Sequence, residues 1–279
     1  MSYKTILVHV DETERAQERI KLAAKIAVAE NAHLIGAAMT GISRFLFQNA
    51  MFEQHDPNLA THLDLLRQRA NRALESFDPL VRSLGVSSWE KRSVDDEAGG
   101  GISLQARYCD LVVIGQTNPD EPIPTVTSDF PEYVVMNAGR PVLIVPYAGE
   151  FNVIGSRVLV AWDASMEATR AITAAIPLLR RAKNVNVLVF NPSARPDAHG
   201  EQPGADIALF LARHGINVEV SQQHTEIDIG NSLLSLATDM STDLIVMGGY
   251  GHSRFREVLL GGATRTILQS MTVPVLMSH

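Results

Sequence analysis

The chain has 279 residues, of which 46% are hydrophobic and 20% charged, so it can fill a core and is unlike a disordered chain. Its formal net charge of −7 disfavours the positive surface that sequence-independent binding to nucleic acid requires, and we expect no nucleic-acid partner. The single cysteine, Cys109, excludes an intrachain disulfide and a cysteine-based zinc site, which favours a reducing cytoplasm.

The first residues run directly into a strand-like segment at 4–10, so we expect no signal peptide. The chain has no apolar run near eighteen residues, so we expect a cytoplasmic protein with no membrane segment. A helix follows the strand, because its apolar residues recur at helical spacing on one face. These are Ala16, Ile20, Ala23, Ala24 and Ala27.

The same strand and helix recur 152 residues later, since Asp11 at the end of the first strand matches Asp163. The second strand lies at 156–162, and the matching helix face follows it. That face consists of Ala168, Ile172, Ala175, Ile176 and Leu179. The chain is therefore predicted to be an internal repeat.

The remaining strands of each copy are continuous runs rich in Val, Ile and Leu, which are typical of parallel strands buried on both faces. In the first copy they lie near 33–39, 86–92, 110–115 and 141–146, and in the second near 185–190, 216–221, 243–248 and 273–278. Their alternation with helices predicts an α/β fold of two tandem doubly wound five-stranded parallel-sheet domains. We place these at 1–149 and 153–279, with an insertion near 41–60 in the first.

The most informative motif lies near the C-terminus, where an apolar strand ends in Gly248-Gly249-Tyr250-Gly251. A second glycine pair, Gly261-Gly262, precedes Ala263, Thr264 and a helix-like stretch. Turns of this kind bring backbone N–H groups and a helix N-terminus against phosphate oxygens. The hydroxyl of Thr264 could donate to a phosphate. Arg254 and Arg265 could add positive charge or could equally lie on a solvated surface.

Two polar residues follow the first strand of the second copy. The carboxylate of Asp163 could accept hydrogen bonds from a ribose hydroxyl or an adenine amino group, although taken alone it also fits a helix cap. Ser165 could contact phosphate or cap the following helix. Because the ends of parallel strands meet at one edge of a sheet, both residues could share a cleft with the glycine turn.

Together these residues resemble the universal stress protein family, as a tandem protein with two such domains. The family motif is Gly, two residues, Gly, nine residues, Gly, then Ser or Thr, and it is matched here by Gly248, Gly251 and Gly261. Gly262 departs from the motif, because it stands in the place of Ser or Thr. The resemblance implies a Rossmann-like fold similar to the adenine nucleotide alpha hydrolases.

The resemblance also implies a ligand and its contacts. Ala161 and Asp163 would lie beside adenine and ribose, and Phe190 and Met247 would flank the base. The segments Gly248–Gly251 and Gly261–Thr264 would hold the phosphates of ATP, AMP or ADP, and Mg²⁺ would accompany ATP. The strands at 142–145 and 275–277 would pair within the chain, and two chains would form a homodimer.

The first copy has lost this motif. Aligned without gaps, Gly251 matches Asn118, and Gly261–Thr264 match Ser128–Pro131. Arg254 and Arg265 are replaced by Glu121 and Glu132, and like charges beside a phosphate are unfavourable. We therefore predict that the first half does not bind ATP, although Asp11 remains.

The sequence thus predicts an adenine-nucleotide-binding regulatory protein of the stress response that binds in its second half only. One alternative is a slow ATPase or phosphotransferase, but no Gly-Lys-Ser/Thr loop and no evident general base is present. Another alternative is a small-molecule binding module in the first half, around the apolar residues of the insertion. Without such a role, the insertion is predicted to be a helical flap that packs on its own domain. Those residues are Phe45, Phe47, Met51 and Phe52.

Overall fold

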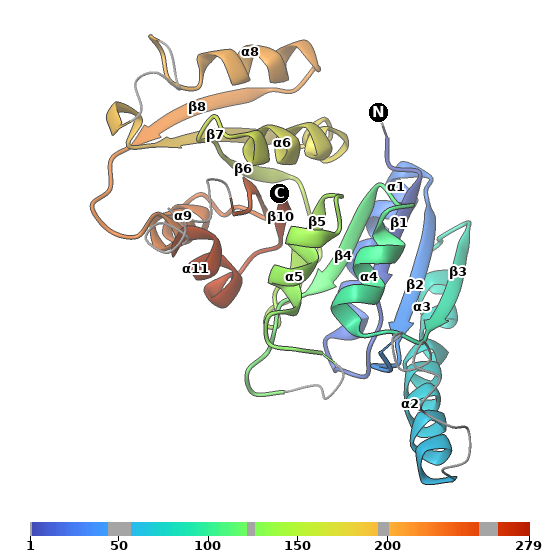
Figure 1. Cartoon of the computed structure of the whole chain (residues 1–279). Coiled ribbons are helices and arrows are strands. Elements are labelled where there is room, and N and C mark those ends of the chain that lie inside the picture. Colours follow the sequence, from blue (N-terminus) through green and yellow to red (C-terminus); the bar gives the residue numbers. More distant parts are fainter. Residues whose placement is uncertain (1, 44–56, 122–125, 195–200, 251–261) are drawn as a thin grey trace. The chain divides into compact units, whose positions relative to one another are not determined.

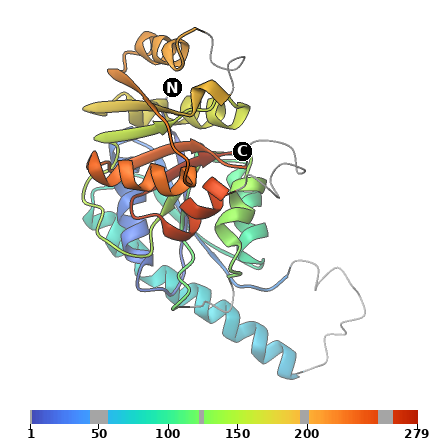
Figure 2. The ribbon, with the colours of Figure 1, turned by 90° about the vertical axis from the view of Figure 1, so that its left-hand side faces the viewer.

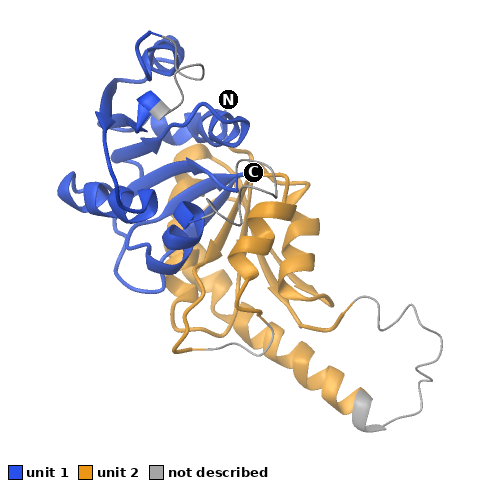
Figure 3. Cartoon of the chain, turned by 60° about the vertical axis from the view of Figure 1, so that its left-hand side comes forward, with its two compact units in different colours: residues 1–2, 141–279 blue, residues 3–140 orange. Residues whose placement is uncertain are grey.

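The computed structural model describes residues 2–43, 57–121, 126–194, 201–250 and 262–279 (Figure 1). The chain divides into two compact units (Figure 3). The first-half unit is Tyr3–Arg140, and the second-half unit is Pro141–His279 together with the N-terminal residues before Tyr3. Most of the predicted insertion, with Phe45, Phe47, Met51 and Phe52, lies outside the described residues.

The first-half unit contains a parallel sheet in the order β3-β2-β1-β4. Its strands are β1 (Thr5–His9), β2 (His33–Met39), β3 (Trp89–Val94) and β4 (Leu111–Gly115). Its helices are α1 (Ala16–Glu30), α2 (Pro57–Glu75), α3 (Phe77–Ser83), α4 (Ala98–Ala106) and α5 (Phe130–Asn137). Figure 1 shows α2 as the long helix beside β2 and β3.

The second-half unit contains the order β5-β10-β9-β6-β7-β8. Its strands are β5 (Val142–Val145), β6 (Arg157–Ala161), β7 (Asn184–Phe190), β8 (Val218–Gln223), β9 (Leu244–Gly248) and β10 (Val275–Ser278). The helices are α6 (Met166–Leu179), α8 (Ala205–Arg213), α9 (Ile229–Asp239) and α11 (Gly262–Ser270), with a 3₁₀ turn, η2, at Pro192–Ala194.

Five strands of the second-half unit are parallel, and β5 joins them antiparallel to β10, with Leu143 opposite Leu276. The predicted pairing of the strands at 142–145 and 275–277 is therefore present. The α/β fold with mostly parallel sheet is also as predicted, because the central strands are buried runs of Val, Ile and Leu. None of the described helices is long and apolar enough to span a membrane.

The two repeated helix faces are buried as expected, with each of the ten apolar residues at most 5% exposed. The outermost strands begin later than predicted, however, β3 at Trp89 and β8 at Val218. The predicted strands include Val86 and Ile216 because both residues are apolar. They are indeed buried, but they pack ahead of the strands rather than within them.

A carboxylate before the fourth strand of each repeat holds the start of the first strand. Asp110 accepts hydrogen bonds from the backbone N–H groups of Lys4 and Thr5, at 2.7 and 3.0 Å. Asp243 accepts from those of Ser156 and Arg157, at 2.9 and 3.2 Å. The same pair of hydrogen bonds in each repeat therefore fixes the register of the first strand. These bonds lie at the amino ends of the strands, opposite to the carboxyl ends where the candidate site lies.

Candidate functional site

The glycine turn of the second half follows β9 and lies against the start of α6. A Cβ atom on Gly248 would lie 2.6 Å from the backbone nitrogen of Ala168 and 2.9 Å from the carbonyl carbon of Glu167. Real Cβ atoms do not come this close to backbone, so only glycine allows the contact. Met247, one residue earlier, is buried within the sheet.

Thr264, in the first turn of α11, is hydrogen-bonded to this glycine turn. Its buried Oγ1 accepts a hydrogen bond from the backbone N–H of Tyr250, at 3.3 Å. Tyr250 has φ of 56°, in the left-handed region, so the chain turns sharply after Gly249. The hydroxyl of Thr264 therefore helps to shape the turn, and its own proton stays available for donation.

Asp163 and Ser165 form a short turn between β6 and α6. Ser165 caps α6, since its Oγ accepts from the N–H of Ala168 at 3.1 Å. Asp163 Oδ1 accepts from the N–H of Ser165 at 3.0 Å, and the Asp163 residue is exposed. The capping alternative thus holds for Ser165, and Asp163 orders the turn while facing solvent.

Ala161 and Phe190 end two neighbouring parallel strands, β6 and β7. Both are half-buried. Beyond Phe190, the side chain of Asn191 exchanges two hydrogen bonds with the backbone of Thr225, at 2.9 and 3.0 Å. All of these residues lie at the carboxyl ends of strands, where ligands bind in open α/β sheets.

Helix α11 begins at Gly262, which is exposed, and the next residue, Ala263, is half-buried. Asp228, which belongs to no motif of the sequence, caps the adjacent helix α9 by accepting a hydrogen bond from the N–H of Asn231 at 3.0 Å. A Cβ on Gly262 would lie 2.9 Å from the other carboxylate oxygen of Asp228.

Other predicted site residues fall elsewhere. Gly251, Arg254 and Gly261 lie outside the described residues. Arg265 is exposed on α11. Within the described ranges, no group of three His, Cys, Asp or Glu side chains is placed to hold a metal ion.

The corresponding place in the first half is filled by the protein's own side chains. Arg19 of α1 is only 4% exposed, and its Nη2 lies 2.8 Å from Asp11 Oδ2. Its Nε donates to the carbonyl oxygen of His9 at 2.6 Å. A Cβ on Gly115, the counterpart of Gly248, would lie 2.5 Å from Arg19 Nη1. The guanidinium therefore occupies the space beside this turn.

His9 and Phe130 complete the filling. His9 is 2% exposed, and its ring centroid lies 5.0 Å from that of Phe130 at the start of α5. In the repeat alignment His9, Arg19 and Phe130 correspond to three alanines, Ala161, Ala171 and Ala263. His9 and Arg19 belong to no motif of the sequence, so the replacement of all three alanines becomes evident only where the fold brings these residues together.

Burial and charge set the ionisation of this cluster. Burial lowers the pKa of His9 to about 4, against the attraction of Asp11, so the imidazole is neutral. Burial alone would raise the pKa of Asp11, but the charges of Arg19 and His9 and the hydrogen bonds from Thr13 together outweigh it, and the pKa falls to about 2. Asp11 therefore already has its counter-ion within the protein.

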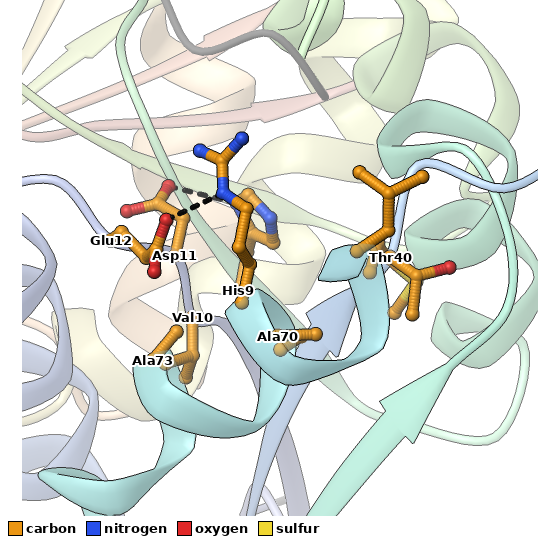
Figure 4. A pocket seen from close by; sticks show the side chains of 11 residues that line it. His9, Val10, Asp11, Glu12, Thr40, Ala70 and Ala73 are labelled. Atoms are coloured by element: carbon orange, nitrogen blue, oxygen red, sulfur yellow. Dashed lines mark hydrogen bonds and ion pairs between the residues drawn. The ribbon is translucent and has the colours of Figure 1, made fainter. Parts of the chain in front are cut away.

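Helix α2 covers the same place. Leu66, Ala70 and Ala73 line a small cavity beside His9 and Thr40, and Arg69 Nε pairs with Glu12 Oε2 at 2.8 Å (Figure 4). The cavity has a volume of about 20 Å³. That is room for roughly one water molecule.

A model of the universal stress protein family matches residues 2–146 and 156–279. The chain is 28% identical over 147 residues to the universal stress protein Slr1230 of Synechocystis sp., a match that covers 52% of this chain and 49% of that protein. The chain thus spans about half the length of this curated relative.

Two solved structures from Archaeoglobus fulgidus give further comparisons. A universal stress protein aligns over 98% of this chain and 97% of its own, with a TM-score of 0.71 and 15% identity, which establishes the fold. A universal stress protein in complex with dAMP aligns over 52% of this chain and 98% of its own, with a TM-score of 0.36 and 15% identity.

Proposed function

The chain belongs to the universal stress protein family, and from this premise we propose that it is a cytoplasmic stress-response regulatory protein that binds an adenine nucleotide in its second half only. The nucleotide is ATP, AMP or ADP, with Mg²⁺ when it is ATP. Asp163, the Gly248–Tyr250 turn and Thr264 are the described residues on which the proposal depends most.

One contrast between the repeats carries the proposal. At Ala161, Ala171 and Ala263 the second half has small side chains, whereas the first half has His9, Arg19 and Phe130. In the first half these side chains fill the place beside Asp11 and Gly115, and Arg19 neutralises Asp11. The second half keeps Asp163 exposed.

The donor set of the second half fits a phosphate ester. The first residues of α11 present backbone N–H groups that have no partner within the helix, and Gly262 there carries no side chain. In the turn after β9, the N–H of Gly249 already donates to the carbonyl oxygen of Ser278 at 2.9 Å, so the small residues Gly248 and Gly249 contribute space rather than that donor. Helix N-termini of this kind favour anions. A bound nucleotide stabilises the folded unit by mass action, which is the physical basis for a regulatory role.

Two alternatives are less well supported. Turnover of ATP needs a positioned nucleophile and metal ligands, and the described residues offer no cluster that would hold a metal on its own. A small-molecule site around the insertion residues Phe45 and Phe52 falls outside the described residues, and the described cavity beside His9, at about 20 Å³, is too small for such a ligand. We further propose that two chains form a homodimer.

The test transfers the filling residue from the first half to the second. We expect Ala263→Phe to abolish binding of a fluorescent ATP analogue, because Phe130 at the matching position occupies the first-half space. The reverse change, Phe130→Ala, is the control and should leave binding unchanged. Thermal unfolding verifies that both variants fold.

Ala161→His supplies a second, independent transfer at the end of β6. Binding that persists in both folded transfer variants would contradict a site between β6 and α11. Loss of binding in Phe130→Ala instead would place the nucleotide in the first half.

A further inference from the structure

Asp228 lies between two helices of the second half, and its two carboxylate oxygens have different surroundings. Oδ1 accepts from the N–H of Asn231 and caps α9. Oδ2 is the atom that a Cβ on Gly262 would approach to 2.9 Å, at the first residue of α11. One carboxylate oxygen therefore caps α9, and the other lies beside the start of α11.

Close packing holds Asp228 in this position. Helices α9 and α11 lie side by side, as both Figure 1 and Figure 2 show. A Cβ on the buried Gly230 would lie 2.8 Å from the carbonyl oxygen of Ala263 and 2.7 Å from the Cβ of Thr266. Because glycine allows the two helices to meet here, the carboxylate cannot move far from α11 without losing its cap.

The sequence departs from the family motif at this same place. Gly262 stands where the motif has Ser or Thr. A Cβ at that position would lie 2.9 Å from Asp228 Oδ2, so a larger residue there would require the carboxylate to shift, whereas glycine leaves it in place. This chain therefore lacks the hydroxyl of the motif, and the carboxylate of Asp228 lies beside the position that it would occupy.

That charge acts against part of the ligand. The N-terminus of α11 favours an anion, and Asp228 already supplies one there. A phosphate chain that extends towards Gly262 therefore meets a carboxylate, and like charges at short range are strongly unfavourable. A ligand with a single phosphate carries less negative charge and is shorter, so it meets less of this repulsion.

We propose that Asp228 is a specificity-determining residue, which makes the second-half site favour adenosine monophosphate over ATP when no divalent cation is present. The inference rests on the proposed function and specifies its ligand. Mg²⁺ bound to the phosphates of ATP offsets the repulsion and narrows the difference.

The experiment measures dissociation constants of AMP and of ATP by calorimetry, in EDTA and then in Mg²⁺. In EDTA the unchanged protein should bind AMP about tenfold more tightly than ATP. Asp228→Asn removes the charge but keeps a capping side chain, and it should bring the two constants within about threefold by strengthening ATP binding. Asp239→Asn, at the exposed far end of α9, is the matched charge control and should keep the tenfold preference.

Each outcome bears on the inference separately from the proposed function. Equal affinities of the unchanged protein for AMP and ATP in EDTA overturn the inference and leave the function standing. An unaltered preference in Asp228→Asn overturns it as well, and Asp228→Ser repeats the test if the first variant does not fold. Failure of the unchanged protein to bind either nucleotide refutes the proposed function and, with it, the inference.

Discussion

Replacing Arg19 by methionine should strongly destabilise the first-half unit. The substitution removes the cation that faces Asp11 at 2.8 Å and the donor to the His9 carbonyl at 2.6 Å, in a place where Arg19 is 4% exposed. Removing one partner of a buried ion pair leaves an uncompensated charge, which costs about 3–5 kcal/mol. The side chain of Asp11, only 9% exposed, then has to carry its charge without a counter-ion or take up a proton.

A surface arginine of the same unit provides the control. Arg69 pairs with Glu12 at 2.8 Å, but both side chains are about one-third exposed, so Arg69→Met should cost less than about 1 kcal/mol. The assay is urea unfolding followed by hydrogen exchange at the amides of β1 and β4. Adding Asp11→Asn to Arg19→Met should recover about 2 kcal/mol, because the orphaned charge is removed. Equal losses in the two single variants would refute the buried charge cluster.

Acid should weaken the first-half unit, because the unfolded chain protonates His9 near pH 6.5 and the folded unit only near pH 4. The loss from this group across that window is about 3 kcal/mol, and His9→Leu should make the pH slope of urea unfolding between those values much smaller. A slope that the substitution leaves unchanged would contradict this. Gly248→Ala should lower stability of the second-half unit by about 1–3 kcal/mol in thermal unfolding, because its Cβ meets the backbone of Ala168; an unchanged melting temperature would show that the contact is loose. Asp243→Ala should cost about 1.5–3 kcal/mol by leaving the N–H groups that begin β6 without their acceptor. A cost below about 0.5 kcal/mol, as at an exposed surface position, would refute that role.

The sequence predicts the sheets well, because buried parallel strands are continuous apolar runs and because each run occurs twice. The strand at 243–248 and its partner at 110–115 are found within one residue as Leu244–Gly248 and Leu111–Gly115. The edge strands are placed less well. Val86 and Ile216 are buried by packing before the strand begins, and hydrophobicity alone does not distinguish these two situations.

The filled place in the first half could have been found from the sequence only in part. The changes from Ala161, Ala171 and Ala263 to His9, Arg19 and Phe130 are visible in the repeat alignment. They lie on a strand and two helices far apart in the chain, and only the fold brings them to one place. The contact of the Arg19 guanidinium with Gly115 depends on side-chain packing that no local pattern encodes.

The role of Asp228 also depends on a tertiary contact and could not be predicted from the sequence. It belongs to no motif, and the sequence around it predicts at most a helix cap. Its place beside Gly262 comes from the close approach of α9 to α11 at Gly230, which is a tertiary contact. The departure at Gly262 was evident from the motif, whereas its structural partner was not.

The number of nucleotide sites per chain tests the central claim most directly. Calorimetric titration of the full chain, first freed of bound nucleotide, with AMP and separately with ATP and Mg²⁺, gives this number. The account predicts one site per chain, lost in Ala263→Phe and kept in Phe130→Ala. Two sites per chain, or one site that survives Ala263→Phe in a folded protein, would contradict it.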